Sequence, residues 1–180
     1  MQNLLTSEDR QLLLDIAREA VVSTVTNIGK IPRTIKSANL LAKRGCFVSI
    51  KINGTLRGCI GNFTADTPLY QQVQEMAAAA ATRDPRFYPM KPSDLTDFQL
   101  EISVLSPLQR ISSPETIKVG QHGIYIEKNF SRGVLLPQVA VEQGWDRETF
   151  LRQTCLKAGL HEDSWMEGAD ISVFTAEVFS

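Results

Sequence analysis

The sequence predicts an α+β fold in which helices pack against a mostly antiparallel sheet. Two β-hairpins are expected, one around Asn53-Gly54 and one over residues 124–136. A hairpin joins antiparallel neighbours, and Asn-Gly suits a type I′ turn because both central residues need a positive φ angle. Two longer segments, ending near residue 25 and spanning 67–84, have helical spacing or helix start signals instead.

The first helix is expected to begin after Thr6 and to continue to about Val25. Thr6 is a suitable N-cap, and Glu8 and Asp9 complement the helix dipole in the first turn. The segment 35–44 has no clear pattern and is expected to be irregular or weakly helical. The first helix should pack on the sheet through small and apolar residues at helical spacing, namely Leu13, Ile16, Ala17, Ala20 and Thr24.

The stretch GCFVSIKINGTLRGCIG, residues 45–61, combines hairpin signals with reactive side chains. A two-residue turn at 53–54 makes residue 50 face 57 and residue 48 face 59. Side chains alternate along a strand, so this register places Arg57 and Cys59 on one face with Val48 and Ile50. The other face then carries Phe47, Lys51, Leu56 and Ile60.

Arg57 and Cys59 allow two interpretations. In the first, the strand end opens to receive a ligand, because a guanidinium on an apolar face needs an anion or water. Gly58 and Gly61 would then mark a bulge or a close approach of ligand to backbone. In the second, Arg57 pairs with a carboxylate of its own chain and Cys59 is a small buried residue. The residues alone favour the second interpretation.

A second helix is expected over residues 67–84, because Pro85 disfavours helical geometry in the residue before it. Arg83, Asp84 and Arg86 then cluster at its C-terminal end. This cluster is either a structural ion network or a subsite for an anion. Residues 98–105 follow as a strand that turns Phe98, Leu100, Ile102 and Val104 to the core and Glu101 and Ser103 to the opposite face.

The last third of the chain is expected to contain the second hairpin, two helices and a final strand over 171–179. Cys155 lies on the inward stripe of the helix that Asp146 caps. His122 precedes the strand that begins at residue 124, where its side chain can project toward a substrate. Such a histidine more often bonds only to nearby backbone, and both roles stay open.

Composition narrows the class of protein. The 180 residues, 43% of them hydrophobic, suit one domain with its own core. A net charge of -1 gives no reason to expect nucleic-acid binding, and no apolar run is long enough to cross a membrane. Three cysteines and no secretory signal indicate a reducing, cytoplasmic location. No zinc pattern, phosphate loop or dinucleotide fingerprint occurs, so neither a metal nor a cofactor is predicted.

Five motifs, in order along the chain, resemble the AMMECR1 domain family. They are LRGCIG at 56–61, RDPRF at 83–87, EISVL at 101–105, GQHGIYIEK at 120–128 and LLPQVAVEQGWD at 135–146. The resemblance implies a single domain, residues 1–180, with a larger and a smaller lobe and with LRGCIG in the cleft between them. Residues 108–118 would connect the lobes. Family members are encoded in many prokaryotes beside Memo-type and radical SAM proteins, which implies a shared pathway.

Two classes of function follow from these features. As an enzyme, the protein would bind a small anionic substrate and use Cys59 as nucleophile, activated by Arg57, with His122 accepting the proton and Glu101 orienting His122. Arg83 or Arg86 would hold a carboxylate or phosphate. As a non-catalytic binding or adaptor module, it would anchor a small ligand or a protein partner through Arg57. Redox sensing by Cys59 is a third possibility. The mixture of reactive side chains favours the enzyme.

Overall fold

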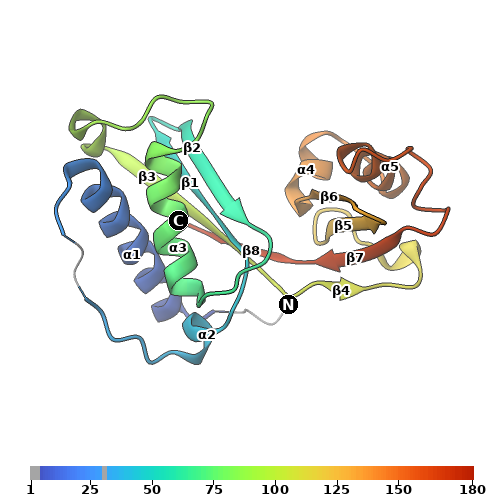
Figure 1. Ribbon diagram of the computed structural model, residues 1–180, viewed down its shortest axis with the longest axis horizontal. Coiled ribbons are helices and arrows are strands. Elements are labelled where there is room, and N and C mark those ends of the chain that lie inside the picture. The colour runs from blue at the N-terminus through green and yellow to red at the C-terminus, as the bar shows by residue number, and fades with distance from the viewer. Residues whose placement is uncertain (1–4, 30–31) are drawn as a thin grey trace. The chain divides into compact units, whose positions relative to one another are not determined.

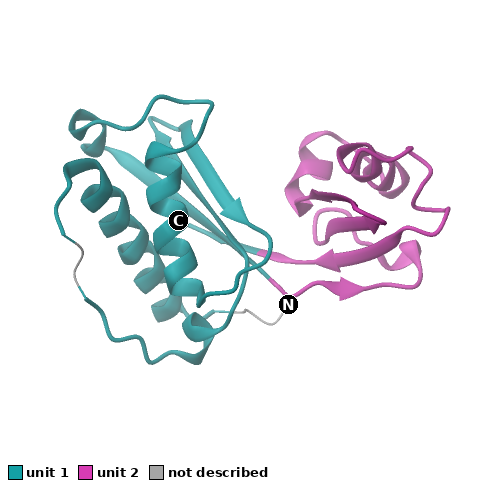
Figure 2. Cartoon of the chain, in the orientation of Figure 1, with its two compact units in different colours: residues 1–105, 177–180 teal, residues 106–176 magenta. Residues whose placement is uncertain are grey.

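The computed structural model describes residues 5–29 and 32–180 (Figure 1). The chain forms two compact units (Figure 2). Unit 1 comprises residues 1–105 and 177–180, and unit 2 comprises residues 106–176. Helices accompany an antiparallel sheet in each unit, so the predicted α+β class is confirmed. None of the described helices combines the length and apolar content needed to cross a bilayer.

Unit 1 is a four-stranded sheet with helices on one face. The strand order is β2-β1-β3-β8. Helix α3 packs against β1 and β2, while α1 packs against α3 and β3 (Figure 1). The elements are α1 (Ser7–Thr26), α2 (Ala38–Leu41), β1 (Cys46–Ile52), β2 (Thr55–Asn62), α3 (Leu69–Thr82), a 3-10 turn (Pro92–Leu95), β3 (Phe98–Leu105) and β8 (Ala176–Phe179).

Helix α1 begins and packs as the sequence predicts. The Thr6 hydroxyl accepts the backbone N–H of Asp9 at 3.1 Å, and the Asp9 carboxylate accepts the backbone N–H of Thr6 at 3.1 Å. These reciprocal bonds satisfy two of the N–H groups that a helix start leaves unpaired. The predicted stripe is buried except at Thr24, and Val21 joins it in the core.

Side chains of β1 and β3 alternate between the helix side and the opposite face of the sheet. Cys46, Val48 and Ile50 are fully buried in the core with the predicted apolar set of β3. Glu101 and Ser103 face the other way, as predicted, because they pair with Ser49 and Phe47 on β1. The sheet of unit 1 therefore has one apolar face under the helices and one face with polar side chains.

The register of the first hairpin differs from the prediction. Asn53 and Gly54 adopt the expected positive φ angles. A β-bulge then shifts the pairing by one residue, so that Ile50 faces Gly58 and Ser49 faces Cys59. A one-residue shift turns every later side chain to the opposite face. The prediction that Cys59 shares a face with Val48 and Ile50 is therefore wrong.

The same shift moves other β2 residues. Ile60 faces Val48 and packs against the helix-side core, instead of sharing a face with Phe47 and Lys51. Gly58, and not Cys59, is the residue of β2 that lies under α3, where it approaches the Ala80 carbonyl group. The bulge thus turns Cys59 away from the hydrophobic core.

Unit 2 is a second antiparallel sheet, with strand order β4-β7-β5-β6. Helix α5 packs against β5 and β6, and α4 packs against β5. Phe150, Leu151 and Cys155 point into its core, as predicted for the helix capped by Asp146. The elements are β4 (Gln109–Arg110), a 3-10 turn (Pro114–Thr116), β5 (Gly123–Lys128), β6 (Ser131–Leu135), α4 (Pro137–Glu142), α5 (Arg147–Lys157) and β7 (Asp170–Phe174).

Two sequence predictions about the connections between the units are wrong. Residues 108–118 lie within unit 2 and do not link the units, since the chain crosses after Leu105 and returns after Ala176. The predicted final strand 171–179 is two strands in different sheets, β7 and β8, interrupted at Thr175. Thr175 exchanges hydrogen bonds with Ser106 in place of continuing the ladder.

Candidate functional site

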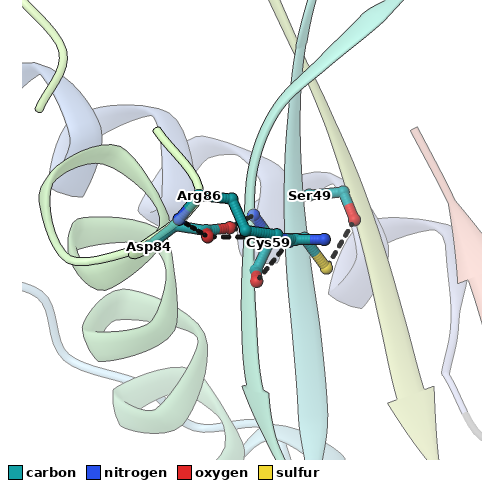
Figure 3. A network of polar contacts seen from close by, with 4 residues as sticks. All are labelled: Ser49, Cys59, Asp84 and Arg86. Atoms are coloured by element: carbon teal, nitrogen blue, oxygen red, sulfur yellow. Dashed lines mark hydrogen bonds and ion pairs between the residues drawn. The ribbon is translucent and has the colours of Figure 1, made fainter. Parts of the chain in front are cut away.

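The backbone of Cys59 is held at the edge of the unit 1 sheet by two side chains that follow α3 (Figure 3). Strand β2 is an edge strand, so its outward N–H and C=O groups lack a neighbouring strand. The Cys59 N–H donates to Asp84 Oδ2 at 2.8 Å, and the Cys59 carbonyl accepts from Arg86 Nη2 at 3.4 Å. Asp84 and Arg86 therefore complete the hydrogen bonding of β2 at Cys59.

Asp84 is the centre of this arrangement. It is 4% exposed, and its carboxylate accepts Arg86 Nε at 3.0 Å, Arg86 Nη2 at 2.7 Å and the Arg86 backbone N–H at 3.1 Å. The Arg86 guanidinium and then the backbone N–H of Cys59 hold the pKa of Asp84 well below its usual range. The hydrogen bond to the Asp84 carboxylate is the main cause that raises the pKa of Arg86.

The thiol of Cys59 points toward the polar face and accepts a hydrogen bond. Ser49 Oγ, directly opposite on β1, donates to Cys59 Sγ at 3.2 Å (Figure 3). Cys59 is partly exposed, whereas Cys46 and Cys155 are fully buried. Burial raises the pKa of Cys46 to about 12 and also raises the pKa of Cys155. Cys59 is thus the cysteine that solution reagents can reach in the folded protein.

Polar side chains continue across the sheet from Cys59. Strand pairing places Cys59, Ser49 and Glu101 in one row across β2, β1 and β3. The Glu101 carboxylate pairs with Lys51 Nζ at 2.9 Å, and both side chains are about one-third exposed. We call Cys59, Ser49, Glu101 and Lys51 the polar row. Sequence reasoning missed Ser49 and Lys51, because only the shifted register brings Ser49 beside the thiol.

Gly58 and Gly61 are explained by packing within the chain. A Cβ added at Gly58 would overlap the carbonyl oxygen of Ala80 in α3. At Gly61 it would overlap the ring of Phe47 and the carbonyl oxygen of Cys46. The space that a side chain would need is therefore filled by the protein itself at both predicted ligand-binding glycines.

The predicted anion-binding arginines differ in their partners. Arg57 Nη2 donates to Asp94 Oδ2 at 3.2 Å, which is the internal pairing that the residues alone favoured. Arg86 is tied to Asp84, although its side chain is 56% exposed. The Arg83 side chain has no ion pair or hydrogen bond within the described residues 5–29 and 32–180. Arg83 is thus a cation that no carboxylate of the described residues pairs with.

His122 lies in unit 2, and its hydrogen bond is local. Its Nδ1 accepts the backbone N–H of Lys118 at 3.3 Å, while the backbone N–H of His122 donates to the Lys118 carbonyl at 2.9 Å. Desolvation, followed by the charge of Lys118, lowers the pKa of His122. A neutral imidazole that accepts at Nδ1 carries its proton on Nε2 and acts there as a donor. This geometry fits the backbone-bonding role that the sequence left open.

No metal centre is evident in the described part of the chain. The His, Cys, Asp and Glu side chains there do not gather into a group of three or more that could hold an ion. The polar row contains one thiol and one carboxylate, and that carboxylate is already paired with Lys51. The chemistry of the row is therefore that of a thiol beside hydroxyl and charged groups.

Nearly the whole chain matches known proteins. A family model described as AMMECR1 matches residues 14–179. The chain belongs to the AMMECR1 family. Protein MK0488 of Methanopyrus kandleri is 41% identical over 189 residues, covering 99% of this chain and 91% of that protein. Protein Mbar_A1807 of Methanosarcina barkeri is 37% identical over 186 residues, covering 98% and 92%.

A solved structure has a similar fold. The crystal structure of uncharacterized protein PH0010 from Pyrococcus horikoshii matches with a TM-score of 0.85 and 38% identity, over 98% of this chain and 93% of that chain. Three of the five motifs recognised in the sequence meet in unit 1. LRGCIG supplies Cys59, RDPRF supplies the Asp84 and Arg86 that hold it, and EISVL supplies Glu101 of the polar row.

Proposed function

We propose that this AMMECR1 protein binds a small anionic substrate at the polar row of unit 1 and uses Cys59 as a nucleophile. The hydrogen bond from Ser49 Oγ to Cys59 Sγ carries the proposal, because a hydroxyl donor stabilises a thiolate. The backbone of Cys59 is also held on both its N–H and its C=O, which keeps the sulfur in one position. A buried structural cysteine needs neither feature.

Positive charge near the thiol supports an anionic substrate. The Arg86 guanidinium donates to the Cys59 carbonyl at 3.4 Å, and Arg83, three residues earlier in the chain, has no carboxylate partner among the described residues. Guanidinium groups bind carboxylates and phosphates with two parallel hydrogen bonds. We assign Arg83 and Arg86 to substrate binding, and we assign Glu101, paired with Lys51, to the charged end of the row.

Iodoacetate is an anionic alkylating reagent, and iodoacetamide is its neutral counterpart. We expect the ratio of the iodoacetate rate to the iodoacetamide rate to be higher for Cys59 in the folded protein than for free cysteine. The expected gain in this rate ratio is about threefold, the size of a partly screened ion pair. Arg83→Ala and Arg86→Ala should reduce the ratio, and Ser49→Ala should slow both reagents by about threefold. Intact-protein mass spectrometry measures both rates, and Cys59→Ser identifies the alkylated residue.

Arg132→Ala is the matched control, because Arg132 is an exposed arginine of the unit 2 hairpin. It should leave the rate ratio unchanged. His122→Ala tests the predicted proton acceptor, and we expect little effect because its Nδ1 is already bonded to backbone. If Cys59 reacts only after unfolding in urea, its thiol is a packed side chain that reagents cannot reach in the folded protein. The non-catalytic binding module would then be the better description.

A further inference from the structure

A hollow beside Arg57 is a second feature of unit 1, on the segment that runs along β2 after α3. Its walls are Arg57, Tyr88, Pro89, Met90, Lys91 and Asp94, and its volume is about 550 Å³. Cavities of this size accept small organic ligands. Met90 forms a buried wall, because its side chain is 5% exposed and its backbone N–H bonds to the Ala81 carbonyl at 2.8 Å.

Arg57 presents unused donors to this hollow. Its side chain is only 21% exposed, yet its guanidinium makes a single bond, from Nη2 to Asp94. A guanidinium has five N–H donors in one plane, so most of them have no partner within the described residues. Asp94 is also occupied elsewhere, since the same Oδ2 accepts the Lys91 backbone N–H at 2.9 Å. A partly buried arginine with free donors can bind an oxyanion at little further cost.

Tyr88 supplies an aromatic surface next to these donors. Its side chain is 89% exposed, although the neighbouring Met90 is buried, and no hydrogen bond holds it within the described chain. An aromatic ring left in water beside a hollow contributes nothing to the core. It offers a flat apolar face on which a ligand ring can stack.

The charges around the hollow favour a ligand with one negative charge. Arg57 and Lys91 are cationic and Asp94 is anionic, so the walls carry a net charge of about +1. A carboxylate matches this value, whereas a phosphate monoester carries about -1.5 to -2 at neutral pH. We propose that the hollow between Arg57 and Tyr88 binds an aromatic carboxylate, with its ring on Tyr88 and its carboxylate on Arg57 and Lys91.

The residues that line this hollow are not those of the polar row, so this inference goes beyond the proposed function and does not rest on it. The probe for its test is indole-3-acetate, titrated into the full chain at millimolar concentration and followed by two-dimensional NMR of backbone amides. Saturable shifts at residues 88–94 are expected. Indole-3-acetamide has the same ring without the charge and should bind about tenfold more weakly. Inorganic phosphate, an anion without a ring, should not saturate.

Substitutions separate the two halves of the hollow. Tyr88→Ala should weaken indole-3-acetate about fivefold, and Tyr88→Phe should keep the affinity, because the ring and not the hydroxyl makes the contact. Arg57→Gln should weaken it about tenfold. Phe130→Ala is the matched control, since Phe130 is a fully exposed aromatic residue of unit 2. It should have no effect.

Equal affinity for the acetate and the amide would overturn the proposal, as would saturable shifts that spare both Arg57 and residues 88–94, or no saturable shifts at all. Retained affinity in both Tyr88→Ala and Arg57→Gln would overturn it too. Binding is measured here without any reaction of Cys59, and the alkylation rates are measured without indole-3-acetate. Either the hollow or the nucleophile can therefore fail while the other stands.

Discussion

Replacing Gly58 with alanine is expected to lower the free energy of unfolding by about 3 kcal/mol. The added methyl group would overlap the Ala80 carbonyl oxygen, which belongs to helix backbone and cannot rotate away. Helix α3 would have to move off β2, where its buried alanine residues now pack closely. Urea denaturation followed by circular dichroism measures the change.

Gly29→Ala provides the control for this prediction. A Cβ at Gly29 meets no atom of the described residues within 4 Å, and Gly29 has no positive φ angle. The unfolding free energy should therefore stay within about 0.5 kcal/mol of the wild type. If Gly58→Ala were equally neutral, α3 would not pack on Gly58, and ligand approach would again be a reason for a glycine at this position.

Replacing Asp84 with asparagine is expected to cost about 2 to 3 kcal/mol of stability at neutral pH. The buried carboxylate accepts the Cys59 N–H and three N–H groups of Arg86, and a neutral amide cannot repeat all of these bonds. The loss should loosen the edge of β2 at the cysteine. Denaturant unfolding measures the cost, and faster hydrogen exchange at the Cys59 amide would locate it.

The effect of Asp84 on stability depends on pH. An unfolded aspartate titrates near pH ~3.9, and the pKa of Asp84 in the folded protein is lower because Arg86 and the Cys59 N–H stabilise its charge. A lowered folded pKa gives stability that is fully present above the unfolded pKa and is lost as the pH falls through the folded pKa. The difference between wild type and Asp84→Asn should therefore shrink below about pH 4.

Asp66→Asn is the control, because Asp66 is an exposed residue of unit 1. It should change stability by less than about 0.5 kcal/mol at neutral pH. A constant difference between wild type and Asp84→Asn from neutral pH down to pH ~2 would contradict the ion pair, since such a difference would not depend on the charge of Asp84.

Features that depend on neighbouring residues in the sequence were predicted well. The Thr6 cap, the turn at Asn53-Gly54, the alternation of β3 and the Asp146 cap all follow from interactions within a few residues. The residues alone also favour a pairing of Arg57 with a carboxylate of its own chain, which the structure confirms. The sequence could not name Asp94 as the partner, because 37 residues separate the two.

Features that depend on the register of strands were predicted less well. The motif LRGCIG contains two glycines compatible with a bulge, but nothing in it states at which residue the ladder shifts. That shift decides whether Cys59 points toward Val48 in the core or toward Ser49. The neighbours of Cys59 therefore differ completely from the predicted ones, although the strand itself was correctly placed.

The sequence by itself determined the α+β class, the AMMECR1 family and most helix and strand positions, because caps, turns and periodicity are local. Only the tertiary structure decided that β7 and β8 belong to different sheets, that Asp84 and Arg86 hold the backbone of Cys59, and that Ser49 and Glu101 extend the row from the thiol. Each of these depends on which distant segments pair, and that choice is made by the packing of the whole unit.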